Sequence, residues 1–314
     1  MKIRLSLLLL FIQTIAFCQP KEDSINLITT TGIIKGSLFV PAGKPTFSVL
    51  IIIAGSGPTD RYGNSPLGVK ANSYKMIADA LGNENIGVLL YDKRGIAKSM
   101  AAAKSEASLS FEDYVADAVR WIGLLKKDKR IKSIFIAGHS EGSLIGMLAA
   151  QQTTVQGYIS LAGPAKGIAE IIIGQFAQQL PKAAPVVDSL FNRLKNNQPL
   201  DTVPQYLQSI FRPSVQPYIK SWMKYIPCNE IKKLTIPTLV IQGGTDIQVS
   251  PAEAESLKQC KPDAAILLVD SMNHVLKNAP LSRMENLATY NNSTLPLAAG
   301  LTTAIVNFIR KYGQ

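Results

Sequence analysis

Residues 132–150 read KSIFIAGHSEGSLIGMLAA, and this stretch decides the fold. A short apolar run at 134–137 comes first, then GHSEG at 138–142, then an apolar segment of helical character. The pattern is that of a G-x-S-x-G nucleophile elbow, in which a strand feeds a sharp turn that opens a helix. The turn forces its serine into a strained backbone region, and glycines on either side allow close packing. We expect the Ser140 hydroxyl to stand exposed at the positive end of the following helix.

The first 18 residues have the organisation of a signal peptide. Two cations precede an apolar segment, 5–17, that is too short to span a bilayer. Small residues stand at the two positions that signal peptidase reads, which predicts cleavage before Gln19 and export to the periplasm or the medium. The alternative is a lipoprotein anchored through Cys18, but Phe17 argues against it, because a small residue is expected just before a lipidated cysteine. No stable membrane span is expected after signal cleavage.

The chain is basic, with 33 Lys and Arg against 22 Asp and Glu and a formal net charge of +11. Its densest basic cluster, at 126–132, falls where a helix is expected to end, and cations there complement the helix dipole. No aromatic residues interleave with this cluster, so no nucleic-acid partner is expected.

Cysteine and histidine are few. Cys228 and Cys260 remain after signal cleavage, and cysteines can pair in an oxidising compartment, but the sequence does not show whether these two lie close together. No Cys/His cluster has metal-ligand spacing, so neither a metal nor another cofactor is expected.

Strands and helices alternate along the chain, which has apolar content for one large core. A capping box of Ser110 and Asp113 opens one of the helices. This alternation predicts an α/β fold, a mostly parallel sheet with helices on both faces and catalytic groups on loops at the carboxyl ends of the strands. The predicted strands span 25–29, 33–40, 48–53, 87–91, 134–137, 157–162, 238–242 and 265–269, and the clearest helices span 74–81, 110–125 and 297–312.

One long stretch interrupts the alternation. Between Gly163 and Leu234 no buried strand is predicted, and the segment is rich in Gln, Pro and helical patches. Because it stands between two late strands, we interpret it as a helical cap, about 164–234, over the active site. Most of its aromatic residues are expected to form the cap's own small core and one or two to line an acyl-sized pocket, with Trp222 the best probe. These aromatics are Phe176, Phe191, Phe211, Tyr218, Trp222 and Tyr225.

The chain has only two histidines. His139 is next to Ser140 on a tight turn, and its side chain is expected to point away from the serine. His274, on the loop after the last predicted strand, is therefore the candidate general base. Asp246 directly follows a predicted strand and completes the order Ser…Asp…His, so we take it as the acid. Asp270 is the alternative, but it lies four residues from His274 and is expected to cap its own loop.

Acyl transfer also needs an oxyanion hole. The N–H of Glu141, directly after the nucleophile, is one candidate donor. The loop AGSGP at 54–58 offers the N–H of Ser56 as the second, with Gly57 as its alternative. The Glu141 side chain is expected to pair with a cation such as Arg61, although it could instead face a substrate amine.

These motifs together resemble the α/β-hydrolase superfamily. The resemblance rests on GHSEG, on the order of Asp246 and His274, and on YDKRGIAKS at 91–99, which is similar to a D-x-R-G-x-G-x-S turn with Ala97 in place of the second glycine. SGPTDR at 56–61 and Asn273-His274 resemble exported bacterial serine hydrolases of the serine aminopeptidase-like and acyl-esterase group. The resemblance covers about 31–312 and implies a single domain, 19–314, that includes the cap.

The residues and the resemblance imply an exported serine hydrolase acting on a small-molecule acyl ester or amide. Ser140 would attack the carbonyl, His274 would take its proton, and Asp246 would stabilise the imidazolium, without a cofactor. Ester hydrolysis is the first expectation. Aminopeptidase-like amide hydrolysis is the alternative, and a non-catalytic binding module is a third possibility. The sequence does not identify the acyl group or the leaving group.

Overall fold

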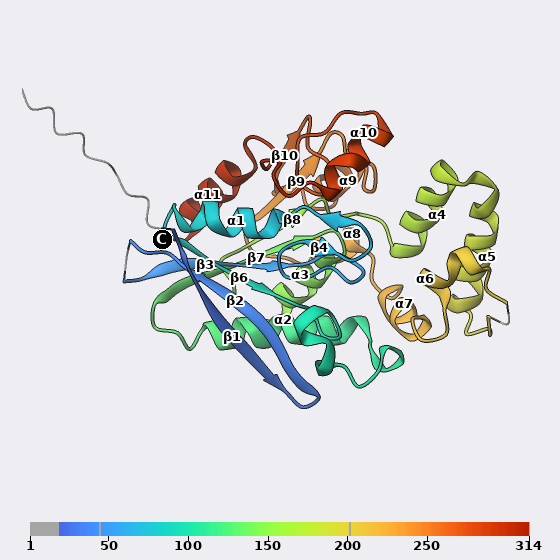
Figure 1. Ribbon diagram of the computed structural model, residues 1–314, viewed down its shortest axis with the longest axis horizontal. Helices are drawn as coiled ribbons and strands as arrows, with labels where there is room; N and C mark the ends of the chain where they lie inside the picture. The colour runs from blue at the N-terminus through green and yellow to red at the C-terminus, as the bar shows by residue number, and fades with distance from the viewer. Residues whose placement is uncertain (1–18, 44, 201, 314) are drawn as a thin grey trace, which may run out of the picture.

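The computed structural model describes residues 19–43, 45–200 and 202–313, so the predicted signal peptide, 1–18, lies outside the described residues. An eight-stranded sheet occupies the centre, in the order β1-β2-β6-β3-β7-β8-β9-β10 (Figure 1). β1 and β2 form an antiparallel hairpin, and β2 pairs antiparallel with β6. All further neighbours in this sheet are parallel. The predicted fold class, a mostly parallel α/β sheet, is confirmed.

The strands of this sheet are β1 (Lys21–Thr29), β2 (Gly32–Val40), β3 (Phe47–Ile53), β6 (Ile86–Tyr91), β7 (Ile131–His139), β8 (Gly157–Leu161), β9 (Thr238–Gly243) and β10 (Ala265–Val269). A short hairpin of β4 (Asn64–Ser65) and β5 (Val69–Lys70) stands apart from them. The helices of the sheet core are α1 (Ser73–Gly82), α2 (Phe111–Leu125), α3 (Glu141–Gln152), α9 (Pro251–Cys260), α10 (Arg283–Ala288) and α11 (Leu301–Tyr312). Single 3-10 turns are η1 (Ala97–Ala102), η2 (Glu106–Ser108) and η5 (Thr289–Asn291).

The central strands are apolar because helices cover both faces of the sheet. β3 is buried at every residue, and its side chains alternate between two hydrophobic clusters. Val49, Ile51 and Ile53 pack with α2 and α3. Leu50 and Ile52 pack on the other face with α1 and α11. The continuous apolar runs of the sequence therefore correspond to strands buried on both sides.

Local signals placed some element boundaries correctly and missed others. At the start of α2, Ser110 N donates to Asp113 Oδ2 at 2.8 Å and Asp113 N donates to Ser110 Oγ at 3.3 Å, so the predicted capping box is present. The last helix begins at Leu301 rather than at 297. Gly300 precedes it with φ 85°, a left-handed conformation in which the helix cannot continue backwards.

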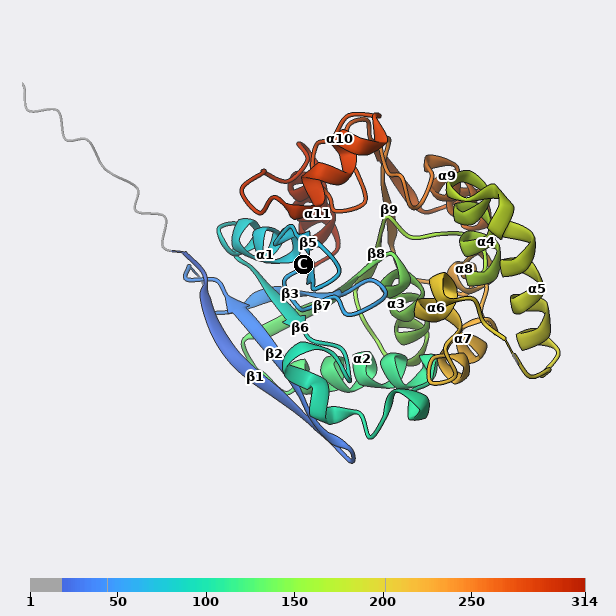
Figure 2. The same ribbon diagram turned by 45° about the vertical axis from the view of Figure 1, so that its right-hand side comes forward.

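Between β8 and β9 the described residues form helices and no strand. These are α4 (Ile168–Gln179), η3 (Pro181–Ala183), α5 (Ala184–Lys195), η4 (Gln205–Leu207), α6 (Gln208–Phe211), α7 (Gln216–Trp222) and α8 (Pro227–Ile231). We call the segment 162–237 the insert. Figure 1 and Figure 2 both show α4 to α7 gathered together at one end of the molecule, while α8 lies closer to the sheet. The insert leaves β8 at its carboxyl end, the end at which β7 meets the Ser140 turn.

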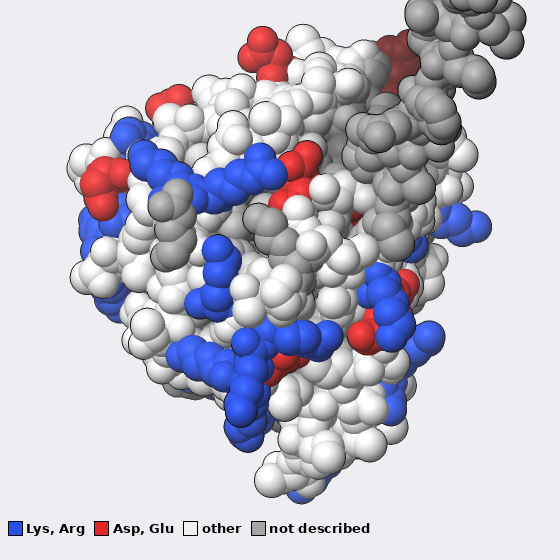
Figure 3. Space-filling view, turned by 90° about the vertical axis from the view of Figure 1, so that its left-hand side faces the viewer, with Lys and Arg blue, Asp and Glu red and all other residues white. Residues whose placement is uncertain are grey.

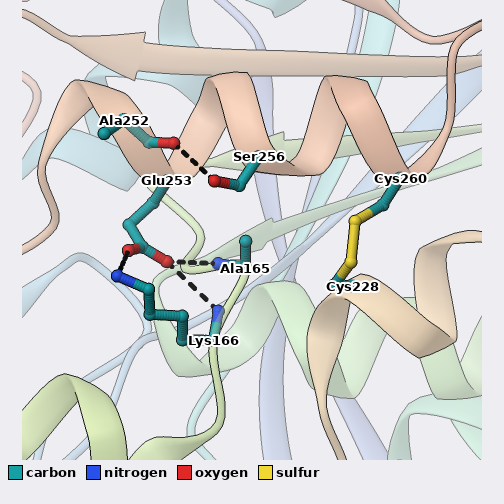
Figure 4. The surroundings of a disulfide bond; sticks show 7 residues. All are labelled: Ala165, Lys166, Cys228, Ala252, Glu253, Ser256 and Cys260. Atoms are coloured by element: carbon teal, nitrogen blue, oxygen red, sulfur yellow. Dashed lines mark hydrogen bonds and ion pairs between the residues drawn. A yellow bond between two sulfur atoms is a disulfide. The ribbon is translucent and has the colours of Figure 1, made fainter.

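Both ends of the insert are held on α9 (Figure 4). Cys228 of α8 forms a disulfide with Cys260, the last residue of α9, which answers the question of pairing left open by the sequence. Glu253 of α9 accepts hydrogen bonds from the N–H groups of Ala165 (2.9 Å) and Lys166 (3.1 Å) at the start of the insert. Cys228 N also donates to Ala165 O at 2.9 Å, so the two ends of the insert contact each other directly.

Aromatic packing within the insert continues into the sheet core. Phe191 and Phe211 form an edge-to-face pair inside the insert, with ring centroids 4.8 Å apart. Trp222 instead stacks on Phe111 of α2, with centroids 5.4 Å apart and planes 13° apart, and only 7% of it is exposed. Its contacts favour a packing role between the insert and α2 over the pocket-lining role expected from the sequence.

On the face that Figure 3 shows, Lys and Arg side chains stand in several groups with uncharged surface between them. In the parts of the chain that the structure describes, no helix combines the length and the apolar character needed to cross a membrane.

Candidate active site

Ser140 lies at the turn between β7 and α3 with φ 53° and ψ −118°, a conformation that costs energy for a residue with a Cβ. Its N–H donates to Leu161 O of β8 at 2.9 Å, which helps to hold the turn. The glycines beside it are required by close backbone contacts. A Cβ on Gly138 would come within 2.1 Å of Gly142 O, and a Cβ on Gly142 within 2.2 Å of Ile53 O. The Ser140 side chain itself is partly exposed.

His274 and Asp246 are hydrogen-bonded to each other. His274 Nδ1 lies 2.8 Å from Asp246 Oδ2, and both residues are buried. The N–H groups of Gln248 (2.8 Å) and Val249 (3.0 Å) donate to Asp246 Oδ1. Burial alone would raise the pKa of Asp246, but His274 and these two N–H groups outweigh it and hold that pKa below its ordinary value. An ionised Asp246 accepts a hydrogen bond from the Nδ1 proton of His274, which leaves Nε2 as the ring nitrogen that can take a proton from the nucleophile.

Asp270, the alternative acid, has different surroundings. Its side chain is exposed, and no hydrogen bond joins it to His274 or to any other described residue. It therefore does not cap its own loop in the way that the sequence suggested.

His139 points away from the serine and supports the His274 loop. Its Nε2 lies 2.8 Å from His274 O, and its Nδ1 lies 2.8 Å from the Tyr74 hydroxyl. Burial lowers the pKa of His139 to about 3, so the ring is neutral near pH 7. A carbonyl oxygen can only accept, so Nε2 carries the proton and Nδ1 accepts from Tyr74. Tyr74 in turn accepts from Gly55 N at 3.4 Å, which connects the loop after β3 to the His274 loop.

The structure brings the three candidate residues to loops at one edge of the sheet. Rings of His139 and His274 have centroids 4.8 Å apart, which places His274 beside the residue that precedes Ser140. Among the described residues, no hydrogen bond joins Ser140 Oγ to His274 Nε2. A bond between nucleophile and base is often long without substrate and tightens when substrate binds.

The candidate oxyanion donors flank Ser140. A Cβ on Gly55 would lie 3.3 Å from the Ser140 Cβ, so the loop that carries Ser56 passes directly beside the nucleophile. Ser56 is exposed, and Glu141 is the first residue of α3. Neither the Ser56 N–H nor the Glu141 N–H donates to another described residue, and the same holds for Gly57. Free N–H groups beside a nucleophile are the donors that a developing oxyanion requires.

The Glu141 side chain does not pair with Arg61, so that expectation was wrong. Glu141 Oε1 accepts from Lys93 Nζ at 2.7 Å, and each side chain is only 2% exposed. Arg61 is instead held by Asp92, with Nη2 and Oδ2 2.6 Å apart. Because Asp92 satisfies Arg61, Lys93 is the cation left for Glu141. The run of three charges, DKR at 92–94, directly after a buried strand indicates buried ion pairs at this place but does not identify their partners.

Within the described ranges, no three His, Cys, Asp or Glu residues are grouped so that they could hold a metal ion.

Comparisons with known proteins find similar sequences and similar folds. A family model described as serine aminopeptidase, S33, matches residues 67–212. The esterase EstD of Thermotoga maritima is 28% identical over 282 residues, which cover 86% of this chain and 65% of that protein. The chain thus spans somewhat less than two thirds of that relative.

Solved structures share the fold at low sequence identity. Est1E from Butyrivibrio proteoclasticus matches with a TM-score of 0.59 and 14% identity, covering 92% of this chain and 98% of its own. The esterase Pf2001 of Pyrococcus furiosus matches with a TM-score of 0.58 and 14% identity, covering 94% of this chain and 92% of its own.

Proposed function

We propose that the chain is a member of the α/β-hydrolase superfamily and a serine hydrolase that cleaves carboxylic esters. The observation that carries the proposal is the hydrogen bond between His274 and an ionised Asp246, placed beside the strained Ser140 turn. Its esterase relative, EstD, supports the choice of an ester substrate.

The proposed reaction assigns a role to each of these residues. His274 Nε2 takes the Ser140 proton while Ser140 Oγ attacks the acyl carbonyl, and Asp246 stabilises the imidazolium through Nδ1. The N–H groups of Ser56 and Glu141 receive the negative oxygen. The alcohol then leaves with the proton from His274, and water activated by the same histidine hydrolyses the acyl-enzyme. Loss of one oxyanion donor costs on the order of 10²–10³ in turnover.

Amide hydrolysis is the second candidate, because the matching family model is that of serine aminopeptidases. An aminopeptidase needs a carboxylate that can face the free amine of its substrate. Glu141 is the acid nearest to the nucleophile in sequence, but it is buried and neutralised by Lys93. This pairing supports an ester over an aminoacyl amide as the substrate.

We propose that the part of the insert from about 164 to 234 is a cap beside the active site of an exported enzyme. The cap role is supported by the exit of the insert from the carboxyl end of β8 and by the stacking of Trp222 on α2. Export is supported by the sequence pattern of residues 1–18 and by the disulfide of Cys228 and Cys260, since disulfides persist in oxidising compartments.

A direct test compares p-nitrophenyl esters of increasing acyl length with aminoacyl p-nitroanilides on the same enzyme preparation. We expect ester turnover at all short chain lengths and far slower amide turnover. A fluorophosphonate probe should label the protein, and peptide mapping should find the label on Ser140. Faster cleavage of the anilides would make amide hydrolysis the preferred function. If the protein neither hydrolyses these substrates nor takes the label, it is not a serine hydrolase.

A further inference from the structure

Lys93 is a buried cation with no part in the proposed chemistry. It follows β6 by two residues, and its side chain is 2% exposed. An ammonium group taken out of water is costly unless hydrogen bonds and an opposite charge compensate it. The partners that hold Lys93 therefore show what its burial achieves.

Lys93 Nζ makes two hydrogen bonds and one cation–π contact. It donates to Glu141 Oε1 at 2.7 Å and to Gly55 O at 2.7 Å. It also lies 4.9 Å from the centroid of the Tyr114 ring, whose face favours a cation. Lys93 thus donates to both the Glu141 carboxylate and the Gly55 carbonyl, and Tyr218 of α7 also lies close to that carboxylate.

Both hydrogen-bond acceptors are joined covalently to the candidate oxyanion donors. The Gly55 carbonyl and the Ser56 N–H are the two ends of one peptide group. That group is planar and trans, so fixing its C=O also fixes the direction of its N–H. A cation on the carbonyl oxygen polarises the N–H as well, which makes it a stronger donor. Glu141 carries the other donor on its own backbone.

We infer that Lys93 is a positioning residue for the oxyanion hole. One ammonium holds the loop after β3 and the first residue of α3 together, and so sets the separation and direction of the Ser56 and Glu141 N–H groups. Lys93 acts through these groups and does not touch the substrate. The inference rests on the proposed function, because it concerns the stabilisation of an oxyanion formed by attack of Ser140.

The test variant is Lys93→Met, which keeps the apolar stem and removes the ammonium. We expect kcat for p-nitrophenyl acetate to fall by about ten-fold to a hundred-fold, less than for complete loss of one donor, with little change in KM. The inhibition constant of a trifluoromethyl ketone should rise by the same factor. Ser140 adds to this ketone and places an alkoxide in the hole, so the inhibitor reports on the donors themselves.

A matched control is Arg94→Met, which removes the neighbouring buried cation and its ion pair with Asp117. It should lower stability while kcat and ketone inhibition of the folded enzyme stay close to wild type. If Lys93→Met behaves in the same way, Lys93 is only a structural residue and the inference is overturned. It is also overturned if kcat falls while ketone inhibition is unchanged.

A second variant covers the case in which Lys93→Met does not fold because Glu141 is left charged and unpaired. Lys93→Met/Glu141→Gln removes both charges and should show the same loss of kcat and of ketone affinity. Glu141→Gln alone should lose less, since Lys93 still holds the Gly55 carbonyl. Equal losses in Glu141→Gln and in Lys93→Met/Glu141→Gln would contradict the inference. Failure of the wild-type protein to hydrolyse esters or to take the fluorophosphonate label would instead refute the proposed function.

Discussion

The sheet core and the insert are stabilised by different kinds of contact. At the carboxyl edge of the sheet, the site is built from directional hydrogen bonds between loops, such as His274 to Asp246 and His139 to His274. The insert is packed on the core by ring stacking and tied to α9 by a disulfide, and its start is also hydrogen-bonded to Glu253. Hydrogen bonds fix the direction of single polar groups, whereas apolar packing holds whole helices against each other. Changes to the hydrogen-bonded residues of the site should therefore affect turnover first, and changes in the packing of the insert should affect stability first.

The largest effect is expected for Ser140→Ala. Removal of a triad nucleophile costs on the order of 10⁶ in turnover, so ester hydrolysis and fluorophosphonate labelling should both disappear. The melting temperature should not fall, because the side chain is partly exposed and the substitution removes only a hydroxyl. Substantial residual turnover at an unchanged melting temperature would contradict the assignment of Ser140.

Asp246→Asn comes next. The amide would favour the wrong tautomer of His274, and the analogous change in a serine protease costs about 10⁴ in turnover. Asp270→Asn is the matched control and should stay close to wild type, because the Asp270 side chain is exposed and has no partner among the described residues. If Asp270→Asn proves the more damaging variant in ester hydrolysis, the acid has been assigned to the wrong residue.

Trp222→Ala tests the packing of the insert on α2. Truncating a buried, stacked Trp should lower the free energy of unfolding by about 3–5 kcal/mol, because Phe111 loses its stacking partner. Turnover should fall equally for short and long acyl chains, and Trp222→Phe should lose less stability. A loss confined to long-chain esters, with stability retained, would restore Trp222 as a pocket residue.

The smallest effect is expected from opening the disulfide. Cys228→Ser/Cys260→Ser should lower the free energy of unfolding by about 2–4 kcal/mol, as removal of a disulfide usually does. Acetate ester turnover should remain near wild type, because Glu253 still holds the start of the insert. Dithiothreitol should lower the unfolding midpoint of the wild type but not of the variant. A wild-type midpoint indifferent to the reductant would show that the bond contributes nothing to stability.

Features encoded by local sequence could be predicted. The elbow around Ser140 depends on glycines placed next to it, the α2 start depends on residues three apart, and the buried strands are continuous apolar runs. The Asp246 and His274 positions followed from chain order after strands, and the structure joins them by a hydrogen bond.

Features that depend on distant partners could not be predicted. The three consecutive charges at 92–94 pair with three separate parts of the chain, namely Arg61, Glu141 and Asp117. Nothing in their spacing says which charge faces which partner, and so the sequence assigned Arg61 to the wrong acid. The stacking of Trp222 on Phe111 is of the same kind, since it joins residues that only the folded chain brings together.

Because the two ends of the insert contact each other, the insert could be replaced by a segment of another length. Ala165 O and Cys228 N are one hydrogen bond apart, so everything between them forms a loop that starts and finishes at nearly the same point. The entropic cost of closing a loop across that gap rises only slowly with the length of the loop. A segment of another length can therefore close the same gap at little extra cost in chain entropy, although it would lack the packing of Trp222 on Phe111 and, without Cys228, the disulfide to Cys260.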